Sequence, residues 1–169
     1  MTIAESLLPE FDREMGLTRQ ILERVPEGKG AWKPHQKSYP MGDLSLHLAT
    51  LPSWAVSTMK QTELDFNPPG GPGFTPPRYE NVAVTVKTFD ENAKAARAAI
   101  ASASDGEMMV MWTLKNGGHA IFSMPRIAVL RSFVMNHMIH HRAQLGVYLR
   151  LNDVPLPPIY GPTADSASS

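Results

Sequence analysis

Apolar residues recur at the spacing of an α-helix in four long stretches of the chain. The first stretch covers about residues 3–24 and follows Thr2 and Glu5, whose hydroxyl and carboxylate are spaced as in a capping box. Pro26 and Gly28 come soon after this stretch and indicate that the helix ends there. Both limits of the first helix are therefore predicted by local sequence.

The second and third helices are expected at about residues 41–61 and 82–103. Pro52 lies inside the second pattern and should kink this helix or end it early, because proline has no amide donor. The third stretch begins with an alternation that would also suit a strand, but residues 90–103 strongly favour a helix. Residues 62–80 contain five prolines and three glycines, which is typical of a long surface loop.

The last long helix is expected from about residue 125 to residue 152, with Gly146 as the one interruption of its pattern. Before this helix, residues 108–122 are extended in character around the turn signal Gly117–Gly118, which indicates a short β-hairpin. After the helix, several prolines predict an extended segment.

Together these elements predict an all-α fold: a four-helix bundle with long crossover connections and a short β-hairpin-like insert before the last helix. The length of 169 residues suits one domain with a core of ordinary size. We expect a single domain over residues 1–162 and a loose C-terminal tail over residues 163–169, which is rich in serine and alanine.

Composition and charge narrow the class of protein. Apolar residues make up 43% of the chain and charged residues 19%, which indicates a globular rather than a disordered protein. Basic and acidic residues number 16 each, so nothing favours nucleic acid or an anionic membrane as a partner. No stretch is apolar enough to span a bilayer, and the acidic first residues do not resemble a signal peptide. A cytoplasmic location is expected.

Histidines are the candidate metal ligands, because the chain has no cysteine and a metal would need nitrogen or oxygen ligands. On an ideal helix, His137 and His141 lie about 40° apart in the middle of the apolar face. Their Cβ atoms would stand about 5–6 Å apart, so that both imidazoles can reach one ion. The only other histidine centred on an apolar helical face is His47.

We therefore predict one divalent metal ion held by His47, His137 and His141. Three histidines leave an open position for water or substrate, as in catalytic zinc sites. Burial of these side chains without partners would be costly, which favours the metal site. A histidine pair one turn apart can also be structural or solvated, and this alternative stays open.

Other residues near the histidines have less defined roles. His140 falls at the edge of the apolar face and is a candidate catalytic residue, but no general base is evident. Gln144 and Tyr148 lie close to the histidines on the same helical face, where they can support a ligand; Gln144 can instead cap another helix. Arg142 is expected to pair with a carboxylate at the helix surface.

Two common metal-site motifs are excluded. The zincin motif needs a glutamate directly after its first histidine, where this chain has Met138. The ferritin-like di-iron bundle needs a pair of Glu-x-x-His motifs, and none is present. A glycine-rich phosphate loop and a Gly-x-Ser-x-Gly elbow are absent as well.

Several segments resemble the DinB-like superfamily of DNA-damage-inducible bundle proteins. The C-terminal part of the resemblance consists of His137–Gln144, Tyr148–Arg150 and Val154–Pro162. Earlier in the chain, the family's first histidine segment and its short polar insert are matched by Trp32–Pro34, Gly42–Ala49 and Trp112–Gly118. The resemblance covers most of the chain.

The resemblance implies a four-helix bundle that holds nickel or zinc through three histidines and forms a homodimer. Carried over by motif, the ligands are again His47, His137 and His141. Ala143 replaces the glycine that is usual in the family, and Pro52 is unusual within the second helix, but neither departure removes a ligand. Some relatives transfer low-molecular-weight thiols or isomerise maleylpyruvate with a thiol cofactor.

Three functions follow as hypotheses. The first is a metal-dependent enzyme, either a hydrolase or a thiol S-transferase, which acts on a small-molecule substrate with a low-molecular-weight thiol. The second is a non-catalytic stress-response protein that binds a metal or a small molecule. In the third, the histidines serve only as a structural staple. A nucleic-acid partner is not expected, because the net charge is zero and no basic helix face stands out.

Overall fold

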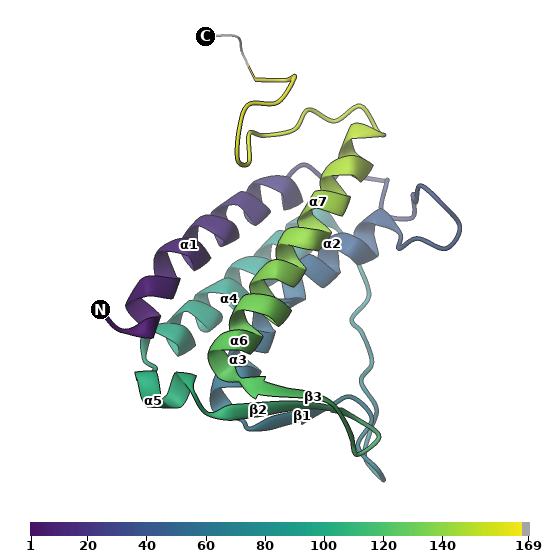
Figure 1. The fold of residues 1–169 in the computed structure, drawn as a ribbon. Helices are drawn as coiled ribbons and strands as arrows, with labels where there is room; N and C mark the ends of the chain where they lie inside the picture. The colour runs from purple at the N-terminus through teal and green to yellow at the C-terminus, as the bar shows by residue number, and fades with distance from the viewer. Residues whose placement is uncertain (167–169) are drawn as a thin grey trace.

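Four long helical segments lie side by side in the computed structural model, which describes residues 1–166 (Figure 1). Contacts join α1 to α4 and α7, α2 to α4 and α7, and α3 to α4 and the π-helix η1. The second segment consists of two helices and the last segment of three, so the bounds are α1 Ile3–Leu22, α2 Met41–Thr50, α3 Ser53–Lys60, α4 Val82–Ala101, α6 Arg126–Val129, η1 Leu130–Asn136 and α7 His137–Arg150.

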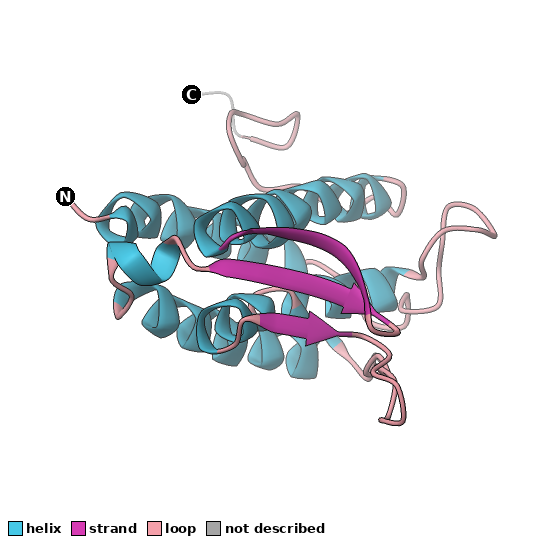
Figure 2. Ribbon diagram, turned by 60° about the horizontal axis from the view of Figure 1, so that its bottom comes forward, coloured by secondary structure: helices cyan, strands magenta, loops and turns pink. Residues whose placement is uncertain are grey.

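A three-stranded sheet packs at one end of the helices (Figures 1 and 2). The expected hairpin is confirmed: β2 and β3 are antiparallel neighbours, and β1 runs parallel to β2 on its other side. A short helix, α5, leads from α4 into the sheet. The bounds of these elements are β1 Glu63–Asp65, α5 Asp105–Met108, β2 Met111–Asn116 and β3 His119–Pro125.

The helix-rich architecture is confirmed, but the all-α class is wrong because β1 completes a sheet inside the expected surface loop. The amide of Thr113 donates to the carbonyl of Thr62 (2.9 Å), and the amide of Phe66 donates to the carbonyl of Lys115 (3.1 Å). Lys115 also forms an ion pair with Glu63, at 2.6 Å. A strand of three residues has no periodicity of its own, and its partners stand about fifty positions later.

The expected helix limits hold with small shifts. The capping box of Thr2 and Glu5 is present at the start of α1, and the second helix is interrupted at Pro52, as expected. The last segment differs, because its interruption is a π-helix before His137, whereas Gly146 lies within regular α-helix. The amide hydrogen bonds of a π-helix span five residues instead of four, so the ideal helical wheel does not apply before His137.

Two clusters of buried side chains hold the fold together. The larger one lies between the long helices and includes Leu7, Phe11, Leu44, Phe89 and Leu145. The smaller one lies under the sheet, with Trp112, Leu114 and Val129 at its centre. Trp54 of α3 packs against both clusters and thereby joins the sheet to the helices.

Residues 163–166 fold back onto the preceding segment. Asp165 pairs with Arg150 and accepts a hydrogen bond from the amide of Leu156 (2.9 Å). The hydroxyl of Thr163 donates to the carbonyl of the same leucine, at 3.1 Å. The rest of the expected loose tail, residues 167–169, lies outside the described residues. None of the helices within residues 1–166 is both long and apolar enough to cross a membrane.

The ring of Tyr79, at the end of the long loop, packs against Gly30 and Gly42. A Cβ atom on Gly42 would stand 2.5 Å from the Tyr79 ring, and a Cβ atom on Gly30 would press on the ring at 2.6 Å. Because the ring would have to shift to admit this Cβ atom, Gly42→Ala should lower the free energy of unfolding by about 1–3 kcal/mol in urea denaturation.

Gly16→Ala is the matched control, because Gly16 is also helical and no other atom lies within 4 Å of its Cβ position. Its free energy of unfolding should stay unchanged or rise by up to about 1 kcal/mol, since alanine favours a helix. Equal effects of the two substitutions would contradict the close approach of Tyr79.

Candidate metal centre

Three histidine side chains converge where α2 packs against the start of α7. The Nε2 atom of His137 lies 2.8 Å from Nε2 of His141 and 3.5 Å from Nε2 of His47. One ligand atom from each residue lies within 4.8 Å of the other two, and all three side chains are partly buried. Within residues 1–166, this is the one group of three or more potential ligands that the structure brings together.

These distances suit a single small cation. In a tetrahedral site with zinc–nitrogen bonds of 2.0–2.1 Å, the ligand nitrogens stand about 3.3–3.4 Å apart. The separations from His137, 2.8 and 3.5 Å, lie on either side of this value. Small side-chain rotations would therefore equalise the distances, and the residues present fit a three-nitrogen metal site.

A hydrogen bond that His141 donates to Gln144 sets the tautomer of His141. The amide oxygen of Gln144 lies 2.7 Å from Nδ1 of His141. Because this oxygen only accepts, Nδ1 carries the proton and Nε2 keeps its lone pair. That lone pair faces His137, so Gln144 prepares His141 to bind a cation.

The second ring nitrogen of His137 limits the tautomer of this residue. Its Nδ1 atom is buried and has no hydrogen-bond partner in the described part of the chain. If Nε2 donated its proton to His141, Nδ1 would keep a buried lone pair without a donor. A cation at Nε2 would bind the lone pairs of the facing Nε2 atoms and leave the proton of His137 on Nδ1.

A π-helix leads directly into His137. This rare geometry frequently occurs at functional sites, and here it ends at Asn136. It places the ring of Phe133 against that of His137, with a centroid distance of 5.6 Å. The sequence carried no signal for the π-helix, because its residues are ordinary helix residues.

Burial favours the neutral form of the three imidazoles. It is the largest cause that lowers the pKa of His47 to about 4, and repulsion from His141 and His137 adds to the effect. The pKa of His137 is lowered by burial and by His141, against an opposing effect of the Phe133 backbone. Burial also lowers the pKa of His141, although the hydrogen bond between His141 and Gln144 raises it in part. Neutral imidazole is the form that binds a metal.

The other candidates lie outside the cluster. His140 is exposed, with its ring centroid 5.0 Å from that of His141. Tyr148 is buried and packs edge-on against Trp32, with a centroid distance of 5.5 Å. Tyr39, which sequence reasoning missed, stacks on His47 with a centroid distance of 6.4 Å.

The expectation of a surface ion pair for Arg142 is wrong, because this side chain is buried. Its guanidinium lies 2.7 Å from the Glu14 carboxylate, and the two side chains are only 4% and 6% exposed. Arg142 also donates to the hydroxyl of Tyr160 (2.7 Å), which in turn donates to Glu14 (2.8 Å). This network joins α7 to α1 beside His141 and fixes the rotation of α7 about its axis.

Comparison with known proteins agrees with this architecture. The DinB family model matches residues 2–167, so the chain belongs to the DinB family, as the sequence motifs indicated.

Two solved structures have a similar fold. A DinB-like protein from Bacillus cereus is 18% identical, with a TM-score of 0.72 over 94% of this chain and 98% of that chain. A DinB-like protein from Bacillus subtilis is also 18% identical, with a TM-score of 0.65 over 94% and 99% of the two chains. A search of the curated proteins finds no match.

The lowered pKa of His47 predicts how metal-free protein responds to acid. Its pKa is about 4 in the folded chain and 6.5 ordinarily, so below pH 6.5 the unfolded state binds a proton that the folded state does not. The free energy of unfolding should therefore fall as the pH falls, and this residue should add no pH dependence above that range. Urea denaturation with a chelator present, between about pH 7.5 and 5, measures the slope.

His47→Gln should flatten this slope, because glutamine does not titrate, whereas His35→Gln in an exposed loop should leave it unchanged. An unaltered slope in His47→Gln would show that burial of this imidazole does not disfavour its charged form.

Proposed function

We propose that this protein holds one divalent metal ion through the Nε2 atoms of His47, His137 and His141, and that the ion binds and activates a small molecule. The observation that carries this proposal is the convergence of three ligand nitrogens within 4.8 Å. They come from two helices that pack against each other. The pKa of each of the three histidines is lowered, which favours the neutral form that a cation needs.

The donor set favours nickel or zinc. All three potential ligands are imidazole nitrogens, and the group contains no carboxylate. Magnesium and calcium prefer oxygen ligands, whereas imidazole suits zinc and nickel. Nickel and zinc are also the metals that the family resemblance implies.

The chemistry proposed is activation of a nucleophile. A divalent ion with three protein ligands supplies Lewis acidity, which lowers the pKa of a thiol or a water that joins it. Gln144 holds the ring of His141 in its binding orientation. His140 is exposed beside His141, and in this proposal it takes a proton from an incoming group.

We favour a metal-dependent enzyme, a thiol S-transferase or a hydrolase, which uses a low-molecular-weight thiol and a small-molecule substrate. The choice of thiol chemistry and of a homodimer rests on the resemblance to relatives, and the cytoplasmic location rests on the composition of the chain. The alternative is a stress-response protein that binds a metal or a small molecule without catalysis. The staple hypothesis is less favoured, because the helical core is extensive and the histidines lie at its partly exposed edge.

Metal content tests the proposal directly. After supplementation with zinc or nickel and dialysis, wild-type protein should carry about one equivalent of metal by mass spectrometry. His47→Ala, His137→Ala and His141→Ala should each weaken binding more than about 100-fold, the upper range for loss of a residue that only supports a ligand. His35→Ala is the control and should bind normally.

A wild-type protein without stoichiometric metal would disprove the central proposal. If metal removal unfolds the chain, the histidines act as a structural staple. If the metal-free fold remains intact, a screen of low-molecular-weight thiols with electrophilic substrates separates an enzyme from a binding protein. Turnover should then disappear in His137→Ala.

Gln144 provides a finer test of the same site. Gln144→Leu removes the acceptor for Nδ1 of His141, so zinc affinity should fall by about 10–100-fold without loss of the site. Gln144→Glu keeps an oxygen acceptor and should retain most of the affinity. Isothermal titration with zinc measures both variants, and equal affinities for Gln144→Leu and wild type would show that the hydrogen bond does not support the ligand.

A further inference from the structure

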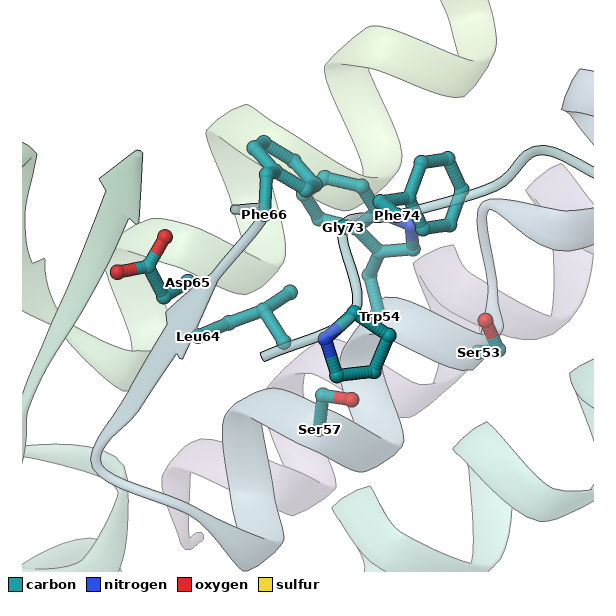
Figure 3. Close-up of a pocket in the computed structure, with 9 residues that line it drawn as sticks. Ser53, Trp54, Ser57, Leu64, Asp65, Phe66, Gly73 and Phe74 are labelled. Atoms are coloured by element: carbon teal, nitrogen blue, oxygen red, sulfur yellow. The ribbon is translucent and has the colours of Figure 1, made fainter. Parts of the chain in front are cut away.

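A pocket of about 260 Å³ lies between α3, β1 and the loop that follows β1 (Figure 3). Three of the nine lining residues are aromatic, namely Trp54, Phe66 and Phe74, and the others are Ser53, Ser57, Leu64, Asp65, Pro72 and Gly73. None of these residues belongs to the histidine cluster, and no motif in the sequence pointed to the pocket.

Three aromatic side chains form a continuous wall. The ring of Phe66 lies 5.3 Å from that of Trp54 and 5.9 Å from that of Phe74, tilted by 56° and 57°. Phe74 is 60% exposed, although its amide is fixed by a hydrogen bond to the carbonyl of Phe66 (2.7 Å). An exposed phenylalanine held in place over a pocket leaves an aromatic face ready for a ligand.

The polar groups of the pocket limit the class of ligand. In Figure 3, Ser57 stands across from the three rings, while the carboxylate of Asp65 points away from them. That carboxylate accepts hydrogen bonds from the amides of Asn67, Gly117 and Gly118. Because these bonds hold it away from the rings, the pocket does not favour an organic cation as its ligand. The side chain of Ser57 lines the pocket, where its hydroxyl is available to a ligand.

The ring of Phe133 lies between Trp54 in the pocket wall and His137 of the candidate metal centre. The ring of Phe133 lies 5.0 Å from that of Trp54 and 5.6 Å from that of His137. In addition, α3 packs directly against the π-helix that carries Phe133. Phe133 thus touches a wall of the pocket on one side and a proposed metal ligand on the other.

We infer that this pocket binds the aromatic ring of a small molecule whose reactive group reaches the metal centre. Aromatic side chains favour a flat ring in a tilted or offset arrangement, and a single ring suits a pocket below the range of about 300–1,000 Å³ that takes drug-sized ligands. Ser57 accepts or donates one hydrogen bond to a substituent on that ring. The position of the reactive group rests on the proposed function, whereas recognition of the ring does not.

Indole tests recognition of the ring in metal-free protein. In a nuclear magnetic resonance titration, indole should shift the signals of Trp54 and Phe74, and Phe74→Ala should weaken its binding by about tenfold or more. The control is Ile159→Ala, in a separate aliphatic pocket of about 300 Å³ between α7 and the C-terminal segment. This variant should bind indole as wild type does. Indole that leaves Trp54 and Phe74 unshifted, or whose binding depends on Ile159, would overturn the inference.

A second experiment tests whether one ligand contacts both the pocket and the metal centre. Cobalt-loaded protein is titrated with imidazole and with 4-phenylimidazole, and the visible absorption of cobalt reports each binding event. The phenyl ring should raise affinity by about tenfold or more in wild type, and Phe74→Ala should bring the two affinities together.

The outcomes separate the two proposals. Equal affinities of the two compounds for the wild-type cobalt centre would overturn the link between pocket and metal, while the metal centre would stand. If neither compound changes the cobalt spectrum but indole still binds at Phe74, the proposed function fails and the ring pocket stands.

Discussion

The packing of α2 against α7 is the contact on which the candidate site depends. A histidine pair on one helix supplies two nitrogens, and the third comes from His47, ninety positions earlier than His137. Their meeting requires that α7 hold one rotation about its axis. The buried pair of Arg142 and Glu14 fixes this rotation, because the two charges cannot separate without leaving an unpaired charge in the core. Stability and site geometry are therefore coupled at α7.

Partial burial gives the histidines their chemical character. It disfavours the charged form of each imidazole, and proximity of the rings adds to this effect. The same proximity leaves ring nitrogens facing one another, and the buried Nδ1 of His137 has no partner among the described residues. A cation satisfies the facing lone pairs, so metal binding would relieve polar groups that the fold alone leaves poorly matched.

The small sheet positions aromatic side chains beside the candidate metal centre. Pairing of β1 with β2 places Phe66 at the end of a fixed strand, and a backbone hydrogen bond then holds Phe74 beside it. Trp54 and Phe133 continue the aromatic contacts from there to the histidines. A loop that composition marks as irregular thus contributes ordered side chains next to the site, because its position is set by strand pairing.

The sequence by itself determined the features that depend on near neighbours. These are the capping box of α1, the break at Pro52, the hairpin, and the pairing of His137 with His141 one helical turn later. His47 was a candidate because of its helical face, but its approach to the pair was decided by helix packing. Only the tertiary structure decided that β1 is a strand, that the chain before His137 is a π-helix, and that Arg142 is buried. The strand and the buried arginine depend on partners far away in the chain, and local periodicity carries no information about such contacts. The residues of the π-helix are those of an ordinary helix, so their pattern does not distinguish the two geometries.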